Sequence, residues 1–139
     1  MRKFVLALAA TAALVTGPAA VAREKLTPQQ QLDKMLAGRE AGKPVSCISN
    51  FAQRNMIILD KTALVYGSGD VIYVNRPRNA SDLDSDDILV THLWGSQLCS
   101  LDIVHTYSRT GWFPTGFISL NEFVPYRKVK TEKPATEGA

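Results

Sequence analysis

Apolar and polar positions alternate with a period of two along the stretch 98–107. The two faces of this stretch are Cys99, Leu101 and Ile103 against Ser100, Asp102 and Thr106. Alternation of this kind predicts a half-buried β-strand. Comparable apolar runs predict further strands over 45–49, 56–59, 63–66, 71–75, 88–94 and 112–118. The run 56–59 is apolar at every position, which is typical of a central strand.

Turn residues separate these runs. The segment 67–70, Gly-Ser-Gly-Asp, lies between 63–66 and 71–75, and its glycines supply the positive φ angles that a tight hairpin requires. Pro114 and Gly116 interrupt the last run, so that run is expected to be a bulged or edge strand.

Helical signals are confined to two places. Thr27 is an N-cap followed by proline, and Gln30 is placed to complete a capping box. An apolar stripe follows and Gly42 is a stop signal, so a short amphipathic helix is predicted over 28–41. The helix is expected to lie on the sheet or its edge, with partner binding as the alternative. The spacing of 119–122 predicts one further helical turn.

These elements predict a β-rich α+β fold: a curled antiparallel sheet or partly open barrel of about six or seven strands with one N-terminal helix. At 139 residues the chain allows one domain. That domain is expected over 45–127, preceded by the helix and a linker over 23–44. Residues 128–139 are charged and have no apolar period, so they are predicted to be a disordered tail.

An export signal is predicted over residues 1–22. Two basic residues precede an apolar run over 4–15, and small residues up to Ala22 suit a signal peptidase. The run is too short to cross a hydrocarbon core about 30 Å thick. We therefore predict cleavage after Ala22 and a periplasmic or secreted protein with no stable membrane anchor; an uncleaved anchor is the alternative.

Cleavage changes the charge of the protein. It lowers the number of basic residues from 16 to 14 against 13 acidic ones, so the net charge falls from +3 to +1. A balance this close to neutral gives no reason to predict a nucleic-acid or polyanion partner.

The two cysteines of the chain are Cys47 and Cys99. In an oxidising compartment two cysteines persist more readily as a disulfide than as thiols, so we predict one structural disulfide. It would close a loop of about 50 residues and restrict the unfolded state by about 4 kcal/mol in the chain-entropy model. A redox pair or a metal site is the alternative, although redox cysteines usually lie close in sequence and metal sites need more ligands.

The two histidines, His92 and His105, lie near the ends of predicted strands. Asp102 falls on the opposite strand face from His105, so it is not placed to orient this histidine as a catalytic triad requires. Neither histidine has a close acidic partner in sequence, which disfavours zinc. The sequence Gly67-Ser68-Gly69 is interpreted as a turn and not as a nucleophile elbow. We therefore predict no catalytic residue, no cofactor and no metal ligand, and keep an unrecognised hydrolase as an alternative.

A polar loop over 76–87 has a length at which function is often found. Its four aspartates suggest calcium, but the glycine and the distal glutamate of an EF-hand loop are missing, so a solvated acidic loop is the preferred interpretation. Arg76 and Arg78 form a candidate patch for an anionic ligand or a cell-wall polymer. The alternative is that these arginines keep strand edges soluble.

Three large aromatic side chains lie near strand ends or turns: Trp94, Trp112 and Phe113. Aromatic side chains stabilise a fold mainly through burial, so packing in the core or against a sheet edge is expected. The alternative is that they line a groove.

A set of short motifs spans residues 43–126. The motifs are Lys43-Pro44-Val45-Ser46-Cys47-Ile48, the run 59–67, Ile72-Tyr73-Val74-Asn75, Leu98-Cys99-Ser100-Leu101-Asp102, and Gly116-Phe117 followed by Phe123-Val124-Pro125-Tyr126. This arrangement resembles a family of small exported proteobacterial proteins catalogued as a domain of unknown function. The landmarks of that family, an early Cys-Ile and a later Cys-x-x-Asp, stand here at Cys47 and Cys99. Many members carry further cysteines that this chain lacks. The resemblance implies an exported domain and no known activity.

The sequence therefore predicts a non-enzymatic exported module with a structural or protein-binding role. One alternative is an envelope-ligand-binding or enzyme-inhibitor protein that uses the loop 76–87 or its two arginines, and the other is a hydrolase. The expected partner is an envelope protein or a cell-wall component.

Overall fold

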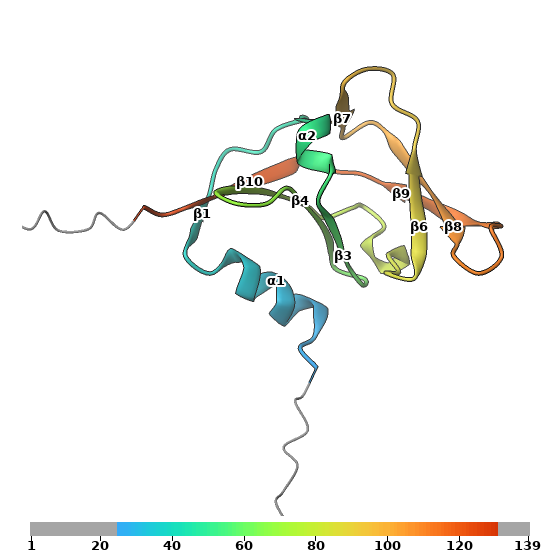
Figure 1. Cartoon of the computed structure of the whole chain (residues 1–139), viewed down its shortest axis with the longest axis horizontal. Helices are drawn as coiled ribbons and strands as arrows, with labels where there is room; N and C mark the ends of the chain where they lie inside the picture. The colour runs from blue at the N-terminus through green and yellow to red at the C-terminus, as the bar shows by residue number, and fades with distance from the viewer. Residues whose placement is uncertain (1–24, 131–139) are drawn as a thin grey trace, which may run out of the picture.

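The structure is a computed structural model that describes residues 25–130 (Figure 1). Residues 1–24, with the predicted signal peptide and its cleavage site, and residues 131–139 lie outside the described residues. The helical segments are α1 (Pro28–Leu36), α2 (Asn50–Gln53) and the 3-10 helix η1 (Ala80–Asp82). The strands are β1 (Arg39–Ala41), β2 (Cys47–Ser49), β3 (Met56–Leu59), β4 (Ala63–Tyr66), β5 (Val71–Asn75), β6 (Asp87–Thr91), β7 (Gln97–Cys99), β8 (Ile103–Ser108), β9 (Pro114–Ser119) and β10 (Phe123–Lys128).

The strands form three antiparallel sheets. The largest has the order β1-β10-β5-β4-β3, the second has the order β6-β8-β9, and β2 pairs with β7. Figure 1 shows α1 against one side of the five-stranded sheet, with β6, β8 and β9 grouped at the other end of the molecule. This architecture confirms the β-rich α+β class. More strands are present than predicted because neither β1 nor β10 was predicted as a strand, and because the stretch 98–107 forms two strands.

The core has two layers that share β4. Side chains of β4 alternate between them, Leu64 and Tyr66 toward one and Ala63 and Val65 toward the other, and all four are buried. The first layer lies between the sheets and also contains Ile48, Leu98, Val104, Ile118, Leu120 and Phe123. The second layer lies against α1 and also contains Leu32, Leu59, Ile72 and Val74. β4 is therefore buried on both of its faces. The prediction that 56–59 is central is wrong, because β3 lies at the sheet edge.

The helix α1 begins as predicted and ends early. Thr27 and Gln30 form the predicted capping box. The chain turns at Gly38, whose φ is 71°, so the predicted extension to residue 41 is wrong. Residues 39–41 pair with β10 instead, and the Arg39 guanidinium donates to the backbone oxygen of Gly69 at 2.7 Å. Among residues 25–130 no helix combines the length and apolar character needed to cross a membrane.

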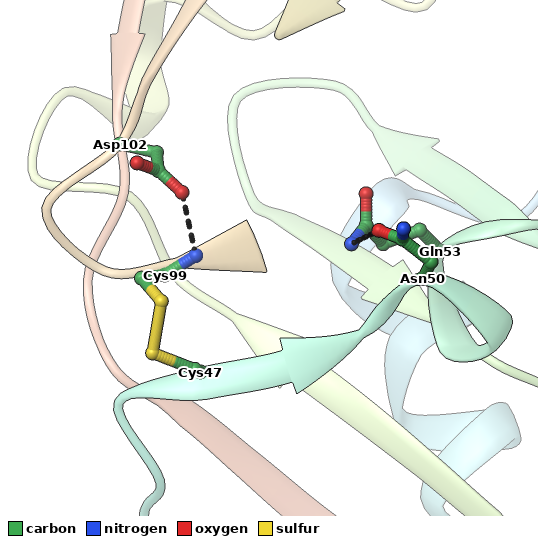
Figure 2. The surroundings of a disulfide bond; sticks show 5 residues. All are labelled: Cys47, Asn50, Gln53, Cys99 and Asp102. Atoms are coloured by element: carbon green, nitrogen blue, oxygen red, sulfur yellow. Dashed lines mark hydrogen bonds between the residues drawn. A yellow bond between two sulfur atoms is a disulfide. The ribbon is translucent and has the colours of Figure 1, made fainter. Parts of the chain in front are cut away.

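The predicted strand 98–107 is interrupted by a turn between β7 and β8. The carboxylate of Asp102 accepts the Cys99 N–H at 2.7 Å (Figure 2), and the Asp102 N–H donates to the Cys99 oxygen at 3.0 Å. Aspartate commonly stabilises turns through such bonds to its own backbone neighbourhood. Leu101 consequently lies in the turn and is exposed. The alternating pattern along 98–107 predicted one continuous strand. That prediction is wrong, because the carboxylate of Asp102 stabilises a turn within this stretch.

One further prediction fails near the C-terminus, and the tail predicted over 128–139 is described only for its first three residues. Residues 120–122 are irregular and form no helical turn, because Asn75 is buried and exchanges hydrogen bonds with the backbone of Asn121. The strand β10 runs to Lys128, and the Val129 N–H donates to the Gly38 oxygen at 3.0 Å. Pairing thus continues into the segment 128–139 that is predicted to be disordered.

The predicted disulfide between Cys47 and Cys99 is present (Figure 2). The two residues are directly opposite each other in the β2–β7 pair, and their Cα atoms lie 4.0 Å apart. Both remaining pairs in this ribbon, Ile48 with Leu98 and Ser49 with Gln97, follow the same register. The disulfide therefore fixes the register of two strands that are each only three residues long.

Replacing Cys99 with serine should lower the thermal midpoint by more than about ten degrees. The physical reason is that the unfolded chain regains the freedom of a loop that joins residues 52 positions apart. Differential scanning calorimetry of the oxidised protein measures the change. The double variant Cys47→Ser/Cys99→Ser is the control and should match the single variant. An unchanged midpoint in the single variant would contradict a stabilising role for the bond.

Candidate functional site

The outer face of the three-stranded sheet carries exposed apolar side chains. Along β8, Val104 and Thr106 are buried toward the core, so the alternating residues point away from it. The cross-strand partners of these residues on β9 include Ser119 and Pro114. We use the name outer face for the apolar and aromatic side chains of this set: Ile88, Val90, Ile103, His105, Tyr107 and Phe117. Ile103 is 53% exposed and Phe117 is 55% exposed. None of the six residues is an acid, a lysine or an arginine.

This arrangement differs from the scattered exposed hydrophobic residues of an ordinary surface. His105 opposes Val90 on one side and Phe117 on the other, so the six side chains run continuously across three strands. Single exposed apolar residues need no explanation, whereas contiguous apolar patches mark interaction sites. The outer face is therefore the first candidate functional site.

The turn between β8 and β9 adds a strained tryptophan at the end of this sheet. Trp112 has a φ of 53°, in the left-handed region. Its N–H donates to the Ser108 oxygen at 3.0 Å, and the Ser108 N–H donates to the Phe113 oxygen at 2.9 Å. A left-handed conformation costs a residue other than glycine about 1–2 kcal/mol. The indole is 69% exposed, so little burial offsets this cost.

The prediction that the large aromatic residues pack in the core or at an edge is wrong. Trp94, Trp112 and Phe113 are all exposed. The inner face of the three-stranded sheet is already filled by the first core layer, and the turn that carries Trp112 and Phe113 leaves the ends of β8 and β9. Trp94 lines a cavity of about 250 Å³ beside Cys99, and the other two aromatic residues are not part of its lining.

The two histidines lie side by side on the outer face. His92 follows β6 and continues the alternation of Val90, and His105 lies on the neighbouring β8. Their ring centroids are 6.3 Å apart, at an interplanar angle of 68°. Both side chains are exposed. Asp102, which sequence reasoning placed on the opposite face from His105, caps β7 and contacts neither ring through a hydrogen bond in the described structure.

A cleft lies between two open strand edges. Among the described residues, β3 pairs only with β4 and β6 pairs only with β8. Met56 of β3 and Leu89 of β6 line two adjoining cavities of about 430 and 240 Å³. The smaller cavity is also lined by Tyr66, and burial raises the pKa of its phenol above the ordinary value of 10.0. In the described part of the chain, the five-stranded and three-stranded sheets are therefore not joined by pairing between β3 and β6.

The structure does not bring Arg76 and Arg78, the two residues of the predicted ligand patch, to one cavity. Arg76 and Arg78 are both exposed, and Pro77 between them is buried. Arg76 and Glu122 both line a cavity of about 210 Å³, so this lining carries one basic and one acidic side chain. The backbone of Arg78 donates to the Ser119 oxygen at 3.0 Å, and its side chain is not part of that lining. Ligand binding by the two arginines stays a prediction.

The aspartates of the loop 76–87 are used in separate local contacts. Asp84 accepts the Asp86 N–H at 2.8 Å, and Asp87 accepts the Thr115 hydroxyl at 2.8 Å. Within residues 25–130, no group of three or more histidine, cysteine, aspartate or glutamate side chains is arranged to hold a metal ion.

Replacing Trp112 with glycine should stabilise the domain by about 0.5–1 kcal/mol. Glycine adopts a positive φ without strain, although its flexibility in the unfolded chain cancels part of the gain. Urea unfolding measures the difference. Phe113→Gly is the matched control, because Phe113 has no positive φ, and it should lose stability. A Trp112→Gly variant less stable than the wild type would show that the contacts of the indole outweigh the strain.

No protein-family model, curated protein or solved structure matches the chain. The resemblance to the exported family therefore stays a prediction that depends on short motifs. The function proposed for this protein rests on its own geometry: the outer face, the Trp112 turn and the cleft at the open edges.

Proposed function

We propose that this chain is an exported protein-binding module that docks an envelope protein on its outer face and on the Trp112 turn. The observation that carries the proposal is the row of apolar and aromatic side chains across β6, β8 and β9, in which Ile103, His105 and Phe117 are exposed and the other three are half-buried. Tyrosine, tryptophan and phenylalanine are enriched in protein interfaces, where charged residues are depleted. The outer face has this composition.

The strain at Trp112 supports the same proposal. A conformation that costs stability persists where the displayed side chain has a use, and an observed outlier is a starting point for a functional hypothesis. Tryptophan is prominent among the residues that dominate binding energy. An exposed indole held at a φ of 53° beside an apolar face suits the anchor of an interface.

The disulfide supports export. Disulfides form and persist in oxidising compartments outside the cytoplasm and are rare within it. The Cys47–Cys99 bond agrees with the signal peptide predicted from the N-terminal sequence. We therefore place the module in the periplasm or outside the cell, where an envelope protein is the partner within reach.

The cleft between β3 and β6 favours a second candidate function, the binding of an envelope ligand. It combines apolar side chains, among them Met56 and Leu89, with the buried Tyr66 at its inner side. Ligand sites are concave, mostly apolar and supplied with a few polar groups. A ligand in the cleft would leave the outer face free.

Expression of the full chain with its own N-terminus should yield a periplasmic protein that begins at Arg23. Its mass should be two hydrogens below that of the dithiol form, because the disulfide removes one hydrogen from each thiol. Intact-mass spectrometry of a periplasmic fraction checks both. A retained N-terminus, or thiols that react with an alkylating agent before reduction, would contradict export with disulfide formation.

Capture of envelope proteins on the immobilised mature chain should depend on the outer face. The variant Ile103→Thr/Phe117→Thr keeps β-branched residues in the strands but removes apolar area, so it should lose the proteins that the wild type retains. Quantitative mass spectrometry of the eluates measures the loss.

Leu101→Thr is the matched control, since Leu101 is 86% exposed, more than Ile103 or Phe117, but lies in the β7–β8 turn outside the outer face. It should retain the same proteins as the wild type. Retention that survives in the Ile103→Thr/Phe117→Thr variant would contradict docking on the outer face. Retention that is instead lost in Leu89→Asp would favour the cleft.

A further inference from the structure

The chain contains two histidines, and the fold places their rings next to each other. They are 13 residues apart in sequence and occupy neighbouring strand positions, His105 within β8 and His92 just after β6. The β6–β8 register pairs Val90 with His105, so His92 lies diagonally across from His105 on the same face. Diagonal neighbours on one face of a sheet are within reach of long or aromatic side chains.

We infer that His92 and His105 form a binding site for a divalent transition-metal ion. Metal–imidazole bonds are about 2.0–2.1 Å long, so two imidazoles on one ion have ring centres about 4.5 Å apart at a right angle, about 5 Å apart at a tetrahedral angle and about 6.4 Å apart when they lie opposite each other. The observed separation of 6.3 Å exceeds the tetrahedral value by about 1 Å, and rotation of the two exposed side chains about their χ angles closes this gap. The angle of 68° between the ring planes is compatible with shared ligation, since each ring can rotate about its metal–nitrogen bond.

The ligand type selects the metal. Neutral imidazole suits Zn²⁺, Ni²⁺ and Cu²⁺, and affinity rises toward Cu²⁺ among these ions. Ca²⁺ and Mg²⁺ require oxygen ligands, which this pair of rings does not offer. Two imidazoles fill two coordination positions, and water fills the others in the free protein. The site is therefore an open one, unlike a structural zinc site with four protein ligands.

The strands hold the two ligands without needing the ion. Both rings are exposed, so an ion reaches them from solvent without any rearrangement of the core. The backbone positions are fixed by the β6–β8 pairing, which is continuous from Asp87 to Thr91. The protein consequently folds without metal and binds the ion afterwards. His105 is also the cross-strand partner of Phe117, so an ion bound by the two histidines would lie on the outer face.

The test titrates the untagged mature chain with Zn²⁺, Ni²⁺ and Cu²⁺ by isothermal titration calorimetry. One ion should bind per chain, most tightly for Cu²⁺. Loss of an outer-shell partner alone commonly costs about 10–100-fold in metal affinity, so loss of a ligand in His92→Gln or His105→Gln should cost at least about tenfold. Both histidines are exposed, and the thermal midpoint without metal should be unchanged in each variant.

The acidic loop supplies the control for ion binding elsewhere. Asp84→Asn/Asp86→Asn removes two exposed carboxylates and should leave the affinity for the three ions unchanged. Paramagnetic broadening by Ni²⁺ or Cu²⁺ in NMR spectra should centre on residues 90–92, 103–107 and 117. Binding that persists in His92→Gln/His105→Gln, or no saturable binding by the wild type, would overturn the inference. The ions alone are the probe, so failure to find a protein partner has no bearing on the result.

Discussion

The covalent bond between Cys47 and Cys99 lies in the short β2–β7 pair, which connects along the chain to both of the larger sheets. On one side β2 follows Val45, which bridges to Phe123 at the start of β10 in the five-stranded sheet. On the other side β7 leads through a short turn into β8, the central strand of the second sheet. A domain of this size is stable by about 5–15 kcal/mol, and a disulfide over such a loop contributes about 4 kcal/mol in the chain-entropy model. The bond therefore supports the packing of one sheet against the other across the shared core layer. Neither β2 nor β7 is long enough to hold that junction by pairing alone.

β8 is the central strand of its sheet, and its two faces differ in burial. Val104 and Thr106 are buried in the core, so this side is committed to stability. The other side carries Ile103 and His105, which are exposed, and Tyr107, which is half-buried. A sheet with one buried face and one solvated face normally has polar residues outside. The outer face departs from this rule, and the proposed docking role would explain both this departure and the strained Trp112, because sites of function often break local rules at a cost in stability.

The parts of this fold that were predicted correctly are mainly those determined by residues adjacent in sequence. The β4–β5 hairpin and the capping box at Thr27 are encoded by a few adjacent residues, and both are confirmed. One failure is local, because the Asp102 carboxylate turns the chain at its own backbone neighbourhood. The others involve contacts distant in sequence: after the turn at Gly38 residues 39–41 pair with β10, and Asn75 holds residues 120–122 in an irregular conformation. The candidate site failed for a related reason: exposure depends on what covers a side chain, and nothing in the sequence near Trp112 shows that its sheet has no cover on the outer face.

The histidine pair shows how register turns two unremarkable residues into a candidate site. A shift of one residue in the pairing of β8 would move His105 to the core face, away from His92. The register of β8 is set in part where the strand begins, and the carboxylate of Asp102 fixes that point by accepting the Cys99 N–H. Cys99 is in turn held opposite Cys47 by the disulfide. The bond that links the two sheets and the turn that follows it therefore also determine which residues of β8 reach the outer face, and hence whether the two imidazoles meet.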